Sequence, residues 1–399
     1  MSVAEVLPAP PRSHVRARIA RGLFARAAAR LHGIEVVLPD GDLLRPQPGA
    51  PRMQILSEAF FHRLGATGKI GFGESYMAGE WRADDLPGVL TAFAHELTSL
   101  VPRPLQLLRR VVDPLQPRSQ RNTPEGARAN IARHYDLSNE LFGLFLDETM
   151  TYSCAIFEPG DTLADAQRRK YQAICDRIQL RESDHLLEIG TGWGGMAMHA
   201  VATTGCRVTT ITLSEQQQQL ARRRLREAGM EDHVKVLVRD YRQLDGRFDK
   251  LASIEMLEAV GERYWAEYFA ACDRMLAPGG RMALQTITMP HGRYRASRRS
   301  YTWIHKYIFP GGLIPSERAI DAALAGGSAL RATASAQIGD HYAPTLRAWR
   351  ERFLERFDEI RALGFDDTFR RTWEFYLAYC EAGFRARALG DVQLTLERR

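Results

Sequence analysis

Long apolar runs are missing from this 399-residue sequence, which nowhere has about 18 consecutive apolar residues. A helix that spans a membrane needs such a run, so the sequence excludes that kind of element. The arginine-rich N-terminal segment is not followed by an apolar core with a small-residue cleavage site, which argues against a secretory signal. We therefore expect a cytoplasmic protein.

Cysteine is scarce as well, and biased segments are absent. The five cysteines include no CxxC pair and have no histidine at ligand spacing, so we expect neither a metal site nor a disulfide framework. No internal repeat or low-complexity tract is present. The formal net charge of +6 favours an anionic partner, either nucleic acid or a lipid headgroup surface, and charge alone does not decide between them.

The N-terminal part begins with an amphipathic basic segment. Its apolar residues recur every four positions among arginines, which predicts a helix: Val15, Ile19, Leu23, Ala27 and Leu31. Such a helix can lie on an anionic membrane or pack its apolar stripe on its own domain, and both interpretations stay open. We also expect short strands and turns over 35–53, a turn at GFGESYMAG (71–79) and a helical region over 86–112.

A polar, proline-bearing stretch over 113–125 is the best candidate for a linker. We place a domain boundary there, with domains at 1–120 and 121–399. After residue 184 strands alternate with helices, which predicts a parallel, doubly wound sheet. The expected strands are His185–Ile189, Arg207–Leu213, Val234–Val238, Lys250–Ile254 and Arg281–Ile287, followed by a helix at Leu346–Leu363 and a late antiparallel strand at Val392–Leu396.

A glycine-rich loop follows the first expected strand, in the segment HLLEIGTGWGG (185–195). Without Cβ atoms the backbone can approach a cofactor closely, and the next helix offers N–H groups to a carboxylate or phosphate. Dinucleotide dehydrogenases use a similar turn, so the glycines alone do not decide the ligand. Here the spacing is Glu188-x-Gly190-x-Gly192-x-Gly194, which resembles the first motif of seven-stranded methyltransferases, where the loop holds the methionine part of S-adenosylmethionine.

The residues after the next two expected strands help to decide between a dinucleotide and S-adenosylmethionine. A dehydrogenase is expected to carry an acid after the second strand, for the ribose hydroxyl. Here hydroxyls and amides come first, among them Thr212 and Gln217, which argues against NAD. After the third strand, Asp240 and Tyr241 are candidates for contacting adenine, and either residue is equally well explained as a strand-end cap.

Two carboxylates three residues apart, Glu255 and Glu258, follow the fourth strand, and chemistry gathers at this edge of open α/β sheets. Together with the glycine loop, three segments resemble the cyclopropane-fatty-acyl-phospholipid synthase and mycolic-acid methyltransferase family: HYDLSNELFGLFLDETMTYSCAIF (134–157), EMLEAVG (255–261) and WIHKYIFPGGLIPS (303–316). GFGESYMAGEW (71–81) is similar to the extra domain of the phospholipid-acting synthases. The resemblance implies an α/β protein, a seven-stranded, Rossmann-like S-adenosylmethionine methyltransferase with an N-terminal α+β lipid-associated domain.

The resemblance also implies a reaction. The double bond of an unsaturated phospholipid acyl chain attacks the methyl group of S-adenosylmethionine, and the resulting carbocation loses a proton to a bound bicarbonate ion in a dry, apolar cavity. By resemblance, the cofactor site also includes Tyr135, Tyr152 and Ser153, and the bicarbonate site involves Cys154, Glu258, Gln285, Ile287 and Tyr342. Cys154 acts there by hydrogen bonding, whereas the residues alone favour a buried structural cysteine.

Two positions depart from the cyclopropane-synthase pattern. The usual histidine of the fifth-strand motif is Gln285, which can still donate to bicarbonate, and the usual glycine three residues before Glu258 is Glu255, which adds a charge near the cation. Both changes are similar to actinobacterial enzymes linked to tuberculostearic (10-methylstearic) acid. We therefore favour a 10-methylene product on an oleoyl chain, saturated later by a separate reductase, over cyclopropane ring closure.

Several alternatives accompany this hypothesis. The stretch Tyr294–Phe309 interleaves aromatic and basic residues, which suits an acyl channel, single-stranded nucleic acid or a packed insertion. The rival functions are a small-molecule N-methyltransferase, against which the extra domain argues, and a non-catalytic nucleic-acid-binding protein, against which the glycine loop and paired acids argue. We expect peripheral attachment to an anionic membrane and no nucleic-acid partner, and we leave open whether the protein is a homo-oligomer.

Overall fold

A computed structural model of the chain describes residues 7–11, 13–96, 117, 123, 126 and 138–398. Internal contacts divide the chain into two compact units. The N-terminal unit comprises 1–115, 300–308 and 346–388, and the sheet unit comprises 116–299, 309–345 and 389–399. The N-terminal unit thus takes in two later segments, whereas the sequence suggests a single boundary near residue 120. The domains 1–120 and 121–399 stay a prediction, and nearly all of the expected linker lies outside the described residues.

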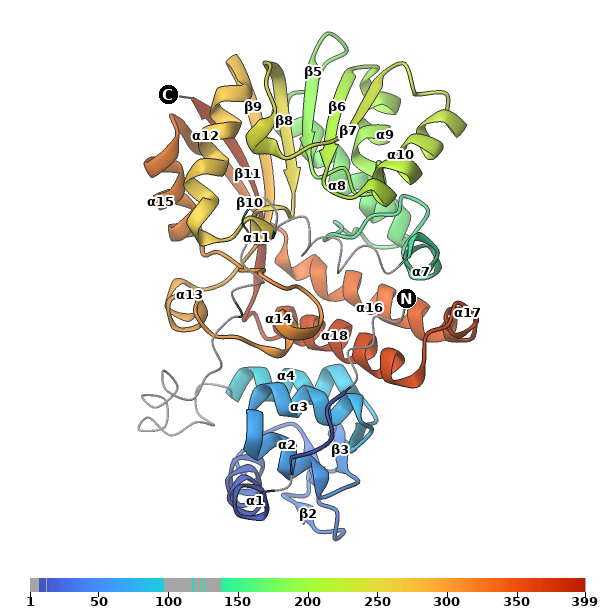
Figure 1. The fold of residues 1–399 in the computed structure, drawn as a ribbon, viewed down its shortest axis with the longest axis vertical. Coiled ribbons are helices and arrows are strands. Elements are labelled where there is room, and N and C mark those ends of the chain that lie inside the picture. Colours follow the sequence, from blue (N-terminus) through green and yellow to red (C-terminus); the bar gives the residue numbers. More distant parts are fainter. Residues whose placement is uncertain are drawn as a thin grey trace. The chain divides into compact units, whose positions relative to one another are not determined.

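The N-terminal unit combines helices with a small mixed sheet of order β2-β1-β3-β4 (Figure 1). Its strands are β1 Glu35–Val37, β2 Leu43–Leu44, β3 Arg52–Ile55 and β4 Trp81–Ala83. They confirm the short strands expected over 35–53. Its described residues form the helices α1 His14–Ala28, α2 Ala59–Thr67, α3 Lys69–Met77, α4 Leu86–Glu96, α14 Trp303–Tyr307, most of α16 Tyr342–Glu355, α17 Phe357–Ala362 and α18 Asp367–Arg385.

The turn expected at 71–79 is wrong, because α3 runs through most of this segment. Its glycines permit close packing: a Cβ on Gly71 would lie 2.1 Å from the carbonyl oxygen of Arg63, and one on Gly73 would lie 2.4 Å from the Trp303 ring. Glycine removes these clashes and therefore sets how closely α3 approaches α2 and α14. The glycines of this segment were interpreted as turn residues, whereas they are required for close helix packing.

The aromatic and basic stretch ending at Phe309 contributes α14 to the N-terminal unit. Trp303 is 4% exposed, and its ring packs edge-on against Phe375 of α18 with 4.9 Å between centroids. Lys306 Nζ and Tyr307 OH both donate to Glu74 of α3, at 2.6 and 2.7 Å. For α14, these contacts support the packed insertion among the three interpretations.

Two helical predictions are confirmed only in part. The region expected over 86–112 is helical as α4 up to Glu96, and the rest lies outside the described residues. The helix expected over 346–363 consists of two helices, α16 and α17, and α18 after them was not predicted. Among the described residues, no helix is both long and apolar enough to cross a membrane.

In the sheet unit, the described residues form seven strands in the order β10-β11-β9-β8-β5-β6-β7 (Figure 1). Their bounds are β5 His185–Ile189, β6 Arg207–Thr212, β7 Val234–Val238, β8 Phe248–Ile254, β9 Leu276–Thr288, β10 Leu330–Gln337 and β11 Gly390–Arg398. Strands β5 to β9 pair in parallel, and β11 lies antiparallel between β9 and β10. The expected strands, including the late antiparallel one, are confirmed, and β10 was not predicted.

Helices cover both faces of this sheet, as expected for a doubly wound fold. One apolar core joins the sheet to α8 (Leu163–Ile178), α9 (Gly195–Thr204) and α10 (Glu215–Glu227). The other joins it to α12 (Trp265–Met275) and α15 (Glu317–Gly327). The remaining elements are α7 Asn139–Phe145, α11 Leu257–Val260, α13 His291–Ser297 and the short 3-10 helices η2 Tyr241–Gln243, η3 Glu262–Tyr264 and η4 Gly339–His341.

Candidate active site

The glycine loop joins β5 to α9, which confirms the strand, turn and helix expected around it. Gly190 has φ +103°, and a Cβ there would lie 2.5 Å from Cγ of Met256. A side chain at this position would therefore meet both backbone strain and a clash. Gly192 and Gly194 also have positive φ, and Gly194 is the N-cap of α9.

A pocket lies where β5, β6 and β8 end, and it collects most of the residues that the sequence assigned to a cofactor. The assigned residues that line it are Tyr152, Ser153, Glu188, Gly190, Gly192, Thr212, Gln217, Asp240 and Tyr241. Gly194 is not among the lining residues, and Tyr135 lies outside the described residues. Glu255, assigned to the chemistry, lines the same pocket.

Glu188 is a buried acid at the base of this pocket, with 3% of its surface exposed. Burial raises the pKa of its carboxyl group to about 8. Its Oε2 atom is buried and has no hydrogen-bond partner among the described residues. An acceptor of this kind beside a glycine loop suits a ligand that brings an ammonium group, as the methionine part of S-adenosylmethionine does.

The polar residues after β6 and β7 are held by local hydrogen bonds. The hydroxyl of Thr212 donates to Oε1 of Gln217 at 2.7 Å. The Asp240 carboxylate accepts the backbone N–H of Arg242 at 2.9 Å and pairs with its guanidinium at 2.6 Å. Asp240 thus caps the start of the 3-10 helix η2, and its contact with adenine stays a prediction.

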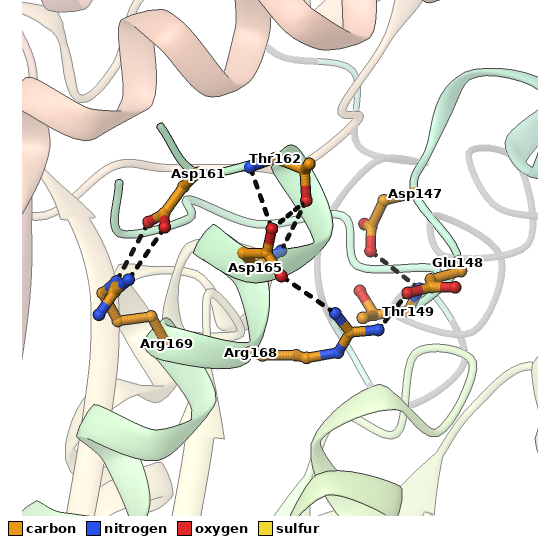
Figure 2. A network of polar contacts seen from close by, with 8 residues as sticks. All are labelled: Asp147, Glu148, Thr149, Asp161, Thr162, Asp165, Arg168 and Arg169. Atoms are coloured by element: carbon orange, nitrogen blue, oxygen red, sulfur yellow. Dashed lines mark hydrogen bonds and ion pairs between the residues drawn. The ribbon is translucent and has the colours of Figure 1, made fainter. Parts of the chain in front are cut away.

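A polar network anchors the loop that carries Tyr152–Cys154 (Figure 2). Thr162 and Asp165 form a capping box at the start of α8, each side chain accepting the other's backbone N–H at 3.2 Å. Arg168 of the same helix binds the carboxylates of Asp165 and Glu148. The loop is thereby tied to α8 just before it reaches the pocket.

Glu255 directly follows β8 and receives hydrogen bonds from three other parts of the sheet unit. The backbone N–H of Cys154 and Nε2 of Gln285 donate to its Oε1 at 2.8 and 3.0 Å. The hydroxyl of Tyr342 donates to its Oε2 at 2.6 Å. The residues that the resemblance assigned to an anion site are therefore brought together, with the carboxylate of Glu255 among them.

Glu258 lies on α11 and faces the end of β9. Its Oε1 accepts the hydroxyl of Thr286 at 2.9 Å and the backbone N–H of Ile287. Its Oε2 is buried without a partner among the described residues. Burial, together with the charge of Glu255, raises the pKa of Glu258 to about 8.

Cys154 is fully buried, and its sulfur donates to the carbonyl oxygen of Ala155 at 3.3 Å. Burial raises the pKa of this thiol well above its usual value, so a thiolate nucleophile is disfavoured. Its contribution to Glu255 comes from the backbone N–H.

Comparison with known proteins identifies the family. Residues 122–394 match the mycolic acid cyclopropane synthetase family. The chain belongs to this family. This cyclopropane synthetase family member is 47% identical to the tuberculostearic acid methyltransferase of Mycobacterium tuberculosis, over the whole chain and 95% of that protein. It is 35% identical to the cyclopropane-fatty-acyl-phospholipid synthase of Escherichia coli, over 94% of the chain and 91% of that protein.

A solved structure of the mycolic acid cyclopropane synthase CmaA1, complexed with SAH and CTAB, is similar to this family member with a TM-score of 0.63. The two are 30% identical, and the match covers 71% of this chain and 99% of that one. The protein is therefore a methyltransferase, and the seven-stranded Rossmann-like fold expected from the sequence is confirmed.

Two buried charged residues of this family member were not predicted as site residues from the sequence. Lys170 of α8 is fully buried and donates to the Ser153 hydroxyl at 2.7 Å, and burial lowers its pKa to about 8. Asp391 of β11 is fully buried, and burial beside Glu255 raises its pKa well above the usual range. Both had a signal: Lys170 falls on the apolar stripe of its helix, and Asp391 begins a strand that otherwise looks buried.

Proposed function

We propose that this protein is an S-adenosylmethionine-dependent C-methyltransferase that acts on the double bond of unsaturated fatty acyl chains in phospholipids. The observation that carries the proposal is the pocket in which the glycine loop and Glu188 share one space with Glu255. The names of its relatives, one for tuberculostearic acid and one for fatty acyl phospholipids, support this class of substrate.

The pocket residues fit the cofactor. When bound, S-adenosylmethionine supplies a methyl group on a positively charged sulfur. The glycine loop admits its methionine part, Glu188 accepts a hydrogen bond from the amino group, and Tyr241 and Asp240 contact adenine. The carboxylate of Glu255, which lines the pocket, stabilises positive charge that develops on the substrate carbon.

The bicarbonate ion implied by the resemblance has a poorer fit. Cys154, Gln285 and Tyr342, the donors assigned to it, are hydrogen-bonded to Glu255 in this structure. In this arrangement the described residues do not offer those donors to a second anion. Bicarbonate stays a prediction of the resemblance, and we assign it no step.

We favour a 10-methylene acyl chain as the product, formed when a hydride shift precedes proton loss, with a separate reductase completing 10-methylstearate. The higher identity to the tuberculostearic acid methyltransferase, 47% against 35% for the cyclopropane synthase, supports this choice. Cyclopropane formation is the alternative product. A small-molecule N-methyltransferase is the more distant alternative.

We also propose that α1 attaches the protein to an anionic membrane surface. Val15, Ile19 and Leu23 are 63%, 57% and 44% exposed, so the first three residues of the predicted stripe do not pack inside, whereas Leu31, after the end of α1, is fully buried. The helix packs through another face, which includes Phe24 and Ala28. Exposed apolar side chains among arginines are typical of helices that lie in a lipid headgroup region.

The proposal is tested by incubating purified protein with labelled S-adenosylmethionine and vesicles of dioleoyl phospholipid, followed by chromatography and mass spectrometry of the acyl chains. We expect labelled chains one carbon heavier with a methylene branch, and no label on saturated lipid. Cyclopropane chains alone would overturn the product preference. Absence of any labelled acyl chain, with label on added amines, would overturn the substrate class.

A further inference from the structure

We propose that the carboxylate of Glu255 takes the place of a bound bicarbonate ion. It faces the positive substrate carbon and accepts the proton released in the reaction. The inference rests on the proposed function and deepens it by naming the proton acceptor. It also makes the reaction independent of bicarbonate.

The hydrogen bonds of Glu255 carry the first step of the argument. Its two carboxylate oxygens accept from Cys154 N–H, Gln285 Nε2 and Tyr342 OH at 2.6–3.0 Å, and the three donors come from three separate segments. Carboxylate and bicarbonate present the same planar pair of acceptor oxygens, so donors arranged for one suit the other. The side chain of Glu255 therefore fills the binding role that a small carboxylate-like anion would have.

The backbone conformation of Glu255 also supports a functional role for this residue. Its φ is +51°, in the left-handed region that glycine adopts readily and in which other residues are strained. Strained residues of this kind concentrate at functional sites and persist where their surroundings hold them. Here the side chain is held by three donors, while the backbone N–H of Glu255 is bound to the carbonyl oxygen of Gln285 at 2.8 Å.

Other ionisable residues lie close to Glu255 in this part of the sheet unit. Burial raises the pKa values of Asp391 and Glu258 above their usual range. Lys170 supplies a buried positive charge to the same cluster. Of these three acids, Glu255 lines the cofactor pocket.

The step is balanced without any further reactant. After methyl transfer and the hydride shift, the positive carbon of the substrate bears the new methyl group, and a C–H bond of that methyl group breaks. Its electron pair forms the double bond of the product, and the proton moves to a carboxylate oxygen of Glu255. The resulting carboxylic acid returns the proton to solvent before the next turnover.

The decisive measurement compares turnover in bicarbonate-free buffer with turnover after bicarbonate is added. For the unmodified protein we expect a change of less than about twofold. Glu255→Gly relieves the backbone strain and removes the carboxylate, so turnover should fall roughly 100-fold or more, and added bicarbonate should restore it at least about tenfold. Glu258→Gln is the matched control, and we expect no bicarbonate rescue because Glu255 still occupies the donors.

Binding of ¹³C-labelled bicarbonate, followed by NMR line broadening, tests the inference without turnover. Glu255→Gly should bind the ion and the unmodified protein should not, and circular dichroism checks that both are folded. If the unmodified protein binds bicarbonate or needs it for turnover, the inference is wrong. If it methylates no acyl chain in either buffer, the proposed function fails, and the binding comparison still decides the place of Glu255.

Discussion

Replacing Val15, Ile19 and Leu23 together by serine should weaken binding of the protein to anionic vesicles by roughly 100-fold. Each side chain is about half exposed, between 44% and 63%. Complete burial of such a side chain stabilises by about 2 kcal/mol, so each exposed half contributes about 1 kcal/mol on entering lipid. Three of them contribute about 3 kcal/mol, and each 1.4 kcal/mol corresponds to about a tenfold change in affinity.

Vesicle co-sedimentation at a fixed phosphatidylserine content measures this effect. The substituted residues are exposed, so the melting temperature should stay nearly unchanged. Leu363→Ser is the matched control, because Leu363 is 45% exposed at the end of a different helix, α17. The arginines of α1 are retained, so the salt dependence should persist. Equal vesicle binding by the folded triple variant and the unmodified protein would refute the role of α1.

Three further predictions concern the candidate active site. Glu258→Gln should lower turnover roughly 100-fold while leaving S-adenosylmethionine affinity, measured by calorimetry, nearly unchanged. Gly190→Ala should weaken that affinity, because the new Cβ would lie 2.5 Å from Met256 at a φ of +103°. For the cofactor-free protein, the free energy of unfolding should fall between pH 4.5 and 8, by about 1.4 kcal/mol per pH unit for each of Glu188 and Glu258.

The sign of the pH effect follows from the raised pKa values. The folded protein binds these two protons more tightly than the unfolded chain, so the stabilisation is complete below pH 4.5 and is lost as pH rises to about 8. Chemical denaturation across this range measures it, and Glu188→Gln should reduce the slope by about half, because Glu258 still titrates. A flat profile for the unmodified protein would contradict the burial argument. Near-normal turnover of Glu258→Gln would show that the reacting centre is misplaced.

Local patterns predicted much of the sheet unit. An apolar strand followed by glycines and a helix is set by neighbouring residues, and β5, the loop and α9 follow it. The strand β10 was not predicted because its sequence, LRATASAQ, alternates small and polar residues without an apolar period. The helix α3 was not predicted because glycines that permit close packing cannot be distinguished in the sequence from glycines that permit turns.

The arrangement of the acids was not predictable in the same way. The sequence indicated that Glu255 adds charge, but its bonds to Cys154 and Tyr342 join residues 101 and 87 positions away. Such contacts depend on the finished sheet, which no local period encodes. Asp391 belongs to the same class, since only strand order brings it near Glu255.

The position of β11 has a consequence for biosynthesis. It is the last of the described strands in the chain, yet it lies inside the sheet, between β9 and β10, and it brings Asp391 and Gln393 to the cluster. A nascent chain on the ribosome folds from its N-terminal side. The edges of β9 and β10 that pair with β11 therefore stay unpaired until β11 has left the ribosome. Ribosome-bound chains that lack β11 should therefore depend on chaperones to shield those edges.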